Sequence, residues 1–160
     1  MATYQGNADF IAVCFDPDDR EIAEQIIARL DAGHLRVWSG SRGCNIQKKN
    51  DAARLAACRT ALIIISQNWL ADGKCTPQLR FAAEHELQTV LLFTDDADLS
   101  TNEELRLLLS RSVRMLDYRA ESAEECFAEL LSLECVQDCK MRDGEQPDEE
   151  KPGLFGFLKR

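Results

Sequence analysis

Mostly polar side chains follow three apolar segments of this sequence, and they are the first candidates for chemistry. They are Phe15, Asp16, Asp18 and Asp19 after the first segment, Ser39, Gly40, Arg42 and Cys44 after the second, and Ser66, Asn68 and Trp69 after the third. If these segments are parallel strands, their carboxyl ends meet at one edge of a sheet, where open α/β folds bind ligands. The helix expected to begin at Thr76-Pro77 would lie nearby.

These residue types argue against several reaction classes. A phospho-receiver domain needs an aspartate at the end of the third strand, where this chain has Ser66. A dinucleotide fingerprint needs a glycine-rich turn after the first strand, but residues 16–19 are acidic, lack glycine and would repel pyrophosphate. Serine and cysteine hydrolases need a histidine base, and His34 and His85 fall away from the strand ends. No cluster of metal ligands is visible, so we expect no metal site.

Five short apolar runs alternate with segments of helical periodicity. We expect strands over residues 10–15, 35–38, 61–65, 89–93 and 113–116, with helices over 16–32, 48–58, 76–86, 101–109 and 122–131. The expected helix starts are Asp16-Pro17, Thr76-Pro77, the pair Thr101 and Glu104, and the pair Ser122 and Glu125. Alternating strands and helices predict an α/β fold with a parallel sheet and helices on both faces. The common solution for five strands is the flavodoxin-like three-layer sandwich, with strand order 2-1-3-4-5.

Size and charge limit the range of partners. The chain has 160 residues, enough for one domain, and a formal net charge of −9, which repels phosphate backbones, so we expect no nucleic-acid partner. No signal peptide opens the chain and no apolar run is long enough to cross a bilayer, so we expect no transmembrane segment and a cytoplasmic location. The seven cysteines are then expected to be reduced and mostly structural.

The composition changes near the two ends of the chain. We predict an N-terminal extension over residues 1–7, a domain over 8–136, and an acidic linker with a short apolar and basic tail over 137–160. Residues 153–160 form either a frayed terminus or a peptide that docks weakly on a membrane or a partner.

Several ordered motifs resemble the Toll/interleukin-1 receptor (TIR) domain family, over about residues 8–133. Residues 9–15 followed by Asp19-Arg20 resemble its first box, and Val37-Trp38 with the following nine-residue loop resembles its second strand and BB loop. Residues 58–70, CRTALIIISQNWL, are the densest match, with Cys75 at the family's usual spacing beyond them. Residues 116–118 then resemble the short fifth strand.

The resemblance implies assembly with itself or with another TIR-domain protein through the BB loop. That loop would comprise Ser39, Gly40, Ser41, Arg42, Gly43 and Cys44. Many members also cleave the nicotinamide–ribose bond of NAD, using a glutamate in a Trp-Cys-x-x-Glu passage that here ends in Gln78. The resemblance implies a nucleotide pocket among Phe15, Asp16, Trp38, Arg42, Ser66, Lys74 and Cys75.

Gln78 and Lys74 depart from the enzymes' passage. An amide cannot neutralise the positive charge that develops on ribose as the bond breaks, so activity should fall by about 10²–10³ or more. A non-catalytic interaction module is therefore favoured, with no required cofactor and NAD as a possible ligand or substrate. An NAD glycohydrolase or cyclase in bacterial signalling or phage defence stays open as the alternative. So does a flavodoxin-like domain outside the family.

Overall fold

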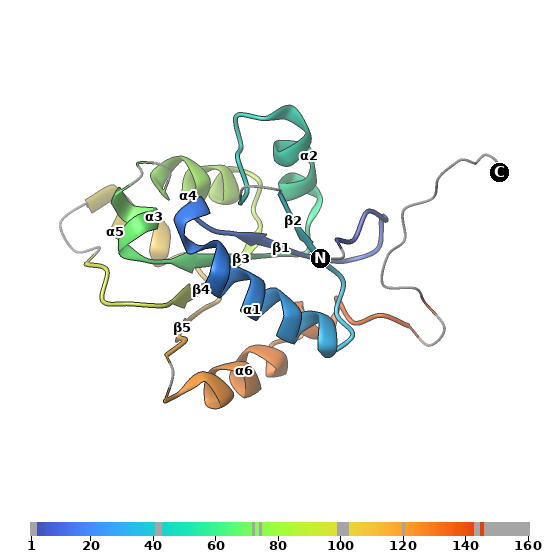
Figure 1. Ribbon diagram of the computed structural model, residues 1–160. Coiled ribbons are helices and arrows are strands. Elements are labelled where there is room, and N and C mark those ends of the chain that lie inside the picture. Colours follow the sequence, from blue (N-terminus) through green and yellow to red (C-terminus); the bar gives the residue numbers. More distant parts are fainter. Residues whose placement is uncertain are drawn as a thin grey trace.

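Five parallel strands form one sheet in the order β2-β1-β3-β4-β5 in the computed structural model of the protein (Figure 1). The strands are β1 (Ile11–Cys14), β2 (Val37–Ser39), β3 (Thr60–Ile65), β4 (Gln88–Phe93) and β5 (Arg114–Asp117). The structure describes residues 3–40, 43–71, 73, 75–98, 103–119, 121–142 and 145, and of Cys75 only the backbone. The predicted fold class, flavodoxin-like α/β with this strand order, is confirmed.

The parallel register aligns the strand ends at one edge of the sheet. Ile11 pairs with both Val37 and Thr60, and Thr60 pairs with Gln88. Strand β5 joins two residues later, where Arg114 pairs with Val90. The segments that follow all five strands therefore lie along a common carboxyl edge.

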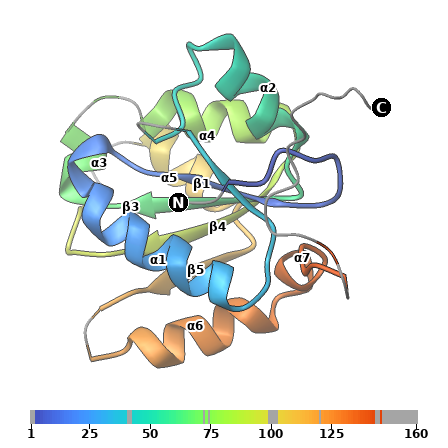
Figure 2. The same cartoon turned by 45° about the vertical axis from the view of Figure 1, so that its right-hand side comes forward.

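Helices cover both faces of the sheet. They are η1 (Pro17–Asp19), α1 (Arg20–Ala32), α2 (Lys49–Ala57), α3 (Gln67–Ala71), α4 (Cys75–Glu84), α5 (Glu103–Leu109), α6 (Ala123–Ser132) and α7 (Glu134–Gln137). Helices α1, α6 and α7 lie on one face, and α2 to α5 lie on the other (Figure 2). Each layer buries one apolar stripe, as the alternation of strands and helices predicts.

Two apolar cores result, one on each side of the sheet. Alternate strand residues face opposite sides, so Val13 packs with Ile26 and Leu30 of α1, while Cys14 packs in the other core with Leu55 and Trp69. Strand β3, apolar after Thr60, contributes to both cores and is buried along its whole length.

The helix starts agree only in part with the sequence patterns. Asp16 caps η1 by accepting a hydrogen bond from the Asp18 backbone, and Pro17 opens it, as predicted. The prediction of Thr76 as a cap is wrong, because α4 already begins at Cys75. Ser122 precedes α6, but its hydroxyl donates to the Asp117 carbonyl (3.4 Å) and makes no cap hydrogen bond. Thr101 lies outside the described residues.

Residues on both sides of the predicted 8–136 domain pack against it. Tyr4 is buried, and its backbone nitrogen donates to the Val37 carbonyl (2.7 Å). At the amino edge of the sheet, the buried Arg36 donates through Nε and Nη2 to both carboxylate oxygens of Glu145, at 2.7 and 3.0 Å. The Arg36 backbone nitrogen also donates to the backbone carbonyl of Cys139 (2.8 Å). The predicted tail at residues 153–160 lies outside the described residues.

Six described cysteines are buried and form no disulfide. They are Cys14, Cys44, Cys58, Cys126, Cys135 and Cys139. Burial raises the pKa of Cys58 and of Cys139 to about 12, and that of Cys126 to about 11. The thiols of Cys58, Cys126 and Cys139 are therefore protonated packing groups at neutral pH, as predicted for structural cysteines.

Candidate functional site

Gln78 lies at the start of α4 and is only 3% exposed. Its Oε1 accepts a hydrogen bond from Trp69 Nε1 (2.8 Å), and its Nε2 donates to the Cys44 carbonyl (2.8 Å). One amide therefore ties together α3, α4 and the segment after β2, which are separated along the chain. A carboxylate could accept from Trp69 but has no proton for Cys44, so this arrangement suits an amide.

Two glycines let the segment after β2 pack closely. Gly43 has φ of +76°, and a Cβ there would lie 2.0 Å from the Phe15 carbonyl oxygen. A Cβ on Gly40 would lie 2.4 Å from the Gly43 oxygen and 2.7 Å from Asp51 Oδ2. Asp51 also accepts a hydrogen bond from the Asn45 backbone (3.0 Å). The segment is therefore held against β1 and α2 by contacts that leave no room for side chains at these two positions.

A polar network joins the ends of β1 and β3. Asp19 accepts hydrogen bonds from the Ser66 hydroxyl and from Asn68 Nδ2, the latter at 2.8 Å. The Ser66 oxygen accepts in turn from the Trp69 backbone (3.0 Å). The carboxylate of Asp19 thus positions the start of α3, and through Trp69 it is connected to Gln78. Ser66 is part of this support, and its hydroxyl donates to a carboxylate, a much weaker base than the histidine of a serine hydrolase.

The thiols of Cys14 and Cys44 are in contact where the segment after β2 lies against β1. A hydrogen bond with Cys44 and burial both raise the pKa of Cys14 well above its usual range. Cys14 ends β1 and Cys44 follows Gly43, so this contact lies beside the close approach of Gly43 to Phe15. The Cys14 thiol is therefore not a reactive thiolate at neutral pH.

The described residues around Gln78 enclose a small cavity. A cavity of about 90 Å³ is lined by Cys44, Asn45, Ile46, Gln47, Gly73, Pro77 and Gln78. Small-molecule sites usually measure about 300–1,000 Å³, so this cavity admits a fragment but not a whole dinucleotide. Within the described part of the chain, no three histidine, cysteine or acidic side chains are arranged to hold a metal ion.

Comparison with known protein families decides where this arrangement belongs. The sequence model of the TIR domain matches residues 11–131. This chain belongs to the TIR domain family. The resemblance found in the sequence motifs is thereby confirmed, and with it membership of a family of signalling and interaction modules.

A solved structure of a protein described as pilus assembly-related, from Burkholderia pseudomallei, has a similar fold. The TM-score is 0.53 with 20% sequence identity, over 87% of this chain and 98% of that chain. At this identity the likeness supports the fold alone. No curated protein sequence matches this TIR domain.

The predicted pocket residues of this TIR domain fall into two groups, those whose side chains the structure describes and those whose side chains it does not. Phe15, Asp16, Trp38 and Ser66 are buried, at 1–5% exposure, within the packing near the strand ends. Phe15 belongs to the core on the α1 side, whereas Trp38 belongs to the core that contains Cys44 and Trp69. Arg42 and Lys74 lie outside the described residues, as does the side chain of Cys75. Their role in nucleotide binding stays a prediction.

The predicted BB loop is described at Ser39, Gly40, Gly43 and Cys44, and its tip, Ser41 and Arg42, lies outside the described residues. The base of this loop packs against β1 and α2 at Gly43 and Gly40. Sequence reasoning missed that Trp69 and the Cys44 carbonyl are the partners of Gln78. The indole and the amide both occur in the motifs, but their pairing depends on the tertiary fold.

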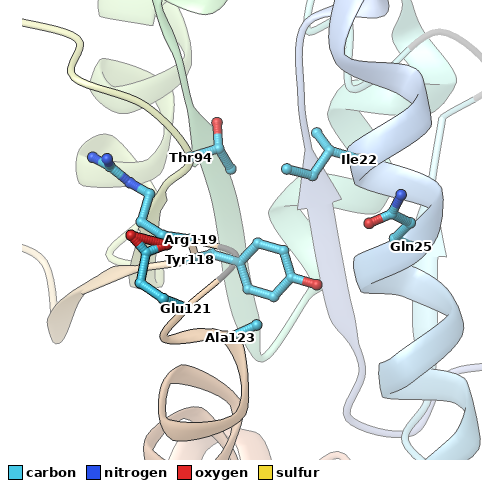
Figure 3. Close-up of a pocket in the computed structure, with 7 residues that line it drawn as sticks. All are labelled: Ile22, Gln25, Thr94, Tyr118, Arg119, Glu121 and Ala123. Carbon is cyan, nitrogen blue, oxygen red and sulfur yellow. The ribbon is translucent and has the colours of Figure 1, made fainter.

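A second cavity at the carboxyl edge was also missed. It measures about 490 Å³ and is lined by Ile22, Gln25, Thr94, Tyr118, Arg119, Glu121 and Ala123 (Figure 3). These residues come from α1, from the ends of β4 and β5, and from the start of α6. The rule that ligands bind beyond strand ends applies here too, but no motif marked these positions.

In the described part of this TIR domain, no helix combines the length and the apolar character needed to span a bilayer.

Proposed function

We propose that this TIR domain is an interaction module that assembles with itself or with another TIR-domain protein and does not turn over NAD. In this proposal Gln78 occupies the position of the family's catalytic glutamate in a degenerate nucleotide pocket. TIR domains generally act through homotypic contacts. We place this assembly in the cytoplasm, which fractionation of expressing cells would test.

The hydrogen bonds of Gln78 are the observation on which the proposal rests. Its oxygen is bonded to Trp69 and its nitrogen to Cys44, so both polar ends of the amide are used inside the protein. A catalytic group must instead meet the reacting atoms of a substrate. An amide in this position supports the base of the BB loop.

Charge and space support the same interpretation. Ribose develops positive charge as the glycosidic bond breaks, and a preorganised anion is the group that stabilises it. Gln78 supplies none, and the described cavity beside it measures about 90 Å³. Asp19, an acid at the neighbouring strand end, is already engaged by Ser66 and Asn68.

The decisive experiment measures nicotinamide release from NAD at high concentrations of the purified protein. We expect no release from the unmodified protein, and concentration-dependent oligomers by light scattering. The variant Gln78→Glu restores the charge, and Gln67→Glu places the same change on the exposed first residue of α3 as a control. Release by the unmodified protein would contradict the proposal and establish the alternative, an NAD glycohydrolase or cyclase of bacterial signalling or phage defence.

Assembly is tested separately at the BB loop. We expect Arg42→Glu to weaken self-association at least tenfold, because a reversed charge at a contact surface repels the partner. Lys140→Glu makes the same change at an exposed position of the amino edge and should leave association unchanged. Equal effects of both variants would show that net charge, and not the BB loop, controls association. Monomers at every concentration, also with candidate TIR partners, would contradict assembly itself.

A further inference from the structure

The cavity beside β4 and β5 has the size and the lining of a small-molecule site, and it is separate from the Gln78 region. Its volume of about 490 Å³ falls within the usual range of 300–1,000 Å³. It opens at the carboxyl edge, between helix α1 and the segments that follow β4 and β5 (Figure 3). None of its lining residues lines the small cavity at Gln78.

Tyr118 forms a fixed aromatic wall of this cavity. The residue is 8% exposed, its backbone nitrogen donates to the Phe93 carbonyl (2.8 Å), and its ring packs edge-on against Phe127. A hydrogen bond with the Tyr118 oxygen raises the pKa of Arg29, whose guanidinium can only donate. The ring is therefore held in place from the strand, from α6 and from α1, and its hydroxyl-bearing edge points toward Gln25 (Figure 3).

Aliphatic and neutral polar groups complete the lining. Figure 3 shows Ile22 and Gln25 reaching in from α1, across from Tyr118, with Thr94 above the Tyr118 ring and Ala123 below it. The Thr94 hydroxyl donates to the Ile65 carbonyl (3.3 Å), so its oxygen remains an acceptor. The Gln25 amide supplies both a donor and an acceptor from an exposed position.

The charged groups at the rim do not favour an anion. Arg119 donates to the Asp95 carbonyl (2.8 Å) and forms ion pairs with Asp96 (3.3 Å) and Asp117 (3.9 Å). In Figure 3 its guanidinium and the Glu121 carboxylate lie on the opposite side of Tyr118 from Ile22 and Gln25. Arg29 is likewise paired with Glu124, at 2.8 Å. Arg119 is paired through Nη2, although its buried Nε has no hydrogen-bond partner among the described residues. A phosphate at Arg119 would still meet the carboxylates of Asp96, Asp117 and Glu121.

We propose that this cavity binds an uncharged planar heterocycle of nucleobase or nucleoside size, packed against the hydroxyl-bearing edge of Tyr118 and against Ile22, and hydrogen-bonded to Gln25 and Thr94. Aromatic rings pack favourably edge-to-face as well as stacked, and a neighbouring amide reads a donor–acceptor edge. The half-buried Ile22 and the exposed Gln25 would lose solvent exposure on binding.

The test is an NMR titration of the ¹⁵N-labelled protein with adenosine, and separately with AMP. We expect adenosine to shift the amide signals of Ile22, Gln25, Thr94 and Ala123, with a dissociation constant of about 1 mM or tighter. AMP should bind the same site several-fold more weakly. Absence of shifts with adenosine, shifts confined to residues around Gln78, or tenfold tighter binding of AMP would each overturn the proposal.

Variants separate binding in the cavity from surface contact. Ala123→Leu fills the cavity and should abolish the adenosine shifts, whereas Ala128→Leu makes the same change on the exposed side of α6 and should not. Gln25→Ala changes an exposed residue that the fold does not need, and should weaken binding about fivefold through loss of one hydrogen bond. Unchanged affinity in both Ala123→Leu and Gln25→Ala would place the ligand elsewhere and overturn the proposal.

Discussion

Among the described residues, the carboxyl edge of the sheet is closely packed above β2, β1 and β3, whereas it holds a larger cavity beside β4 and β5. Above the first three strands, Gln78, Trp69 and the Cys44 carbonyl satisfy one another, and Gly43 lies directly against Phe15. Beside the last two strands, Tyr118 and Ile22 leave a cavity of about 490 Å³. Gln78, the proposed position of the family's glutamate, is thus engaged in supporting contacts, whereas the larger of these two described cavities lies where no family motif was recognised.

A polar residue at a strand end can either support the fold through internal hydrogen bonds or remain available to a ligand. Asp19, Ser66 and Gln78 all lie where ligands usually bind, yet each has its hydrogen bonds inside the protein. Thr94 and Gln25 look ordinary in the sequence, but they line open space. Position relative to the sheet shows where a ligand can bind, and only the hydrogen-bond partners show which groups remain available to it.

On the closely packed side, the largest loss of stability is expected from a substitution at Gly43. Gly43→Ala should destabilise the protein by more than about 4 kcal/mol or prevent folding, because its Cβ would overlap the Phe15 carbonyl and its φ is positive. Gly73→Ala has a similar φ, +75°, with no neighbouring atom within 4 Å, and should cost only about 1 kcal/mol. Urea denaturation followed by circular dichroism measures both. Equal losses would show that backbone strain alone, and not close packing, makes Gly43 necessary.

The next largest effect is expected from Gln78→Leu. This change keeps a similar volume but leaves the Trp69 indole N–H and the Cys44 carbonyl buried without partners, which should cost about 3 kcal/mol. The exposed Gln67→Leu should change stability by less than about 0.5 kcal/mol. Urea midpoints of the two variants provide the comparison. A neutral Gln78→Leu would mean that the amide does not support the loop, and would reopen a role in ligand binding.

Matched insertions of a larger side chain test the difference in packing directly. Ala82→Leu, at a position 2% exposed on α4, should destabilise the protein by about 2 kcal/mol, since no space exists there. Ala123→Leu points into the cavity and should change stability by less than about 0.5 kcal/mol. Thermal unfolding of both variants decides the point. A large loss from Ala123→Leu would mean that the cavity is not available space.

The smallest effect is expected at the amino edge, away from both regions. The hydrogen bond from Arg36 lowers the pKa of Glu145 in the folded protein. Its contribution is therefore complete above the ordinary glutamate pKa of the unfolded chain, and it is lost as the pH falls through the lowered folded value. Glu145→Gln should cost about 1 kcal/mol at pH 7, and the difference from the unmodified protein should shrink in acid. Urea midpoints across pH 7 to pH 3 measure it, and a difference that grows in acid would contradict this sign.

The sequence predicts the fold well because its information is local. The apolar runs at β1, β3 and β4 are short, continuous and separated by helical periodicity, so strand order follows from a common topology. Helix α3 was missed because its five residues are too few to show a period. The cap expected at Thr76 failed because α4 begins one residue earlier.

The candidate site is less predictable because its contacts join distant residues. The Gln78 amide meets the Cys44 carbonyl, 34 positions away, and nothing in either segment indicates that pairing. The cavity depends on how α1 diverges from the ends of β4 and β5, a property of packing that residue types do not encode. Sequence therefore located the carboxyl edge correctly, but it could not distinguish filled from open parts of that edge.

The buried cysteines make local opening of this protein measurable with alkylating reagents. A buried thiol with its pKa near 12 does not react while it is packed. The labelling rate at Cys58 or Cys139 therefore measures how often the surrounding structure opens locally to water. Cys44 is the last residue of the predicted BB loop, and Cys139 lies beside the Arg36 contact. Peptide mapping after timed labelling would therefore follow opening at the two edges of the sheet independently. A partner that binds over the predicted BB loop would slow alkylation of Cys44 and leave the alkylation rate of Cys139 unchanged.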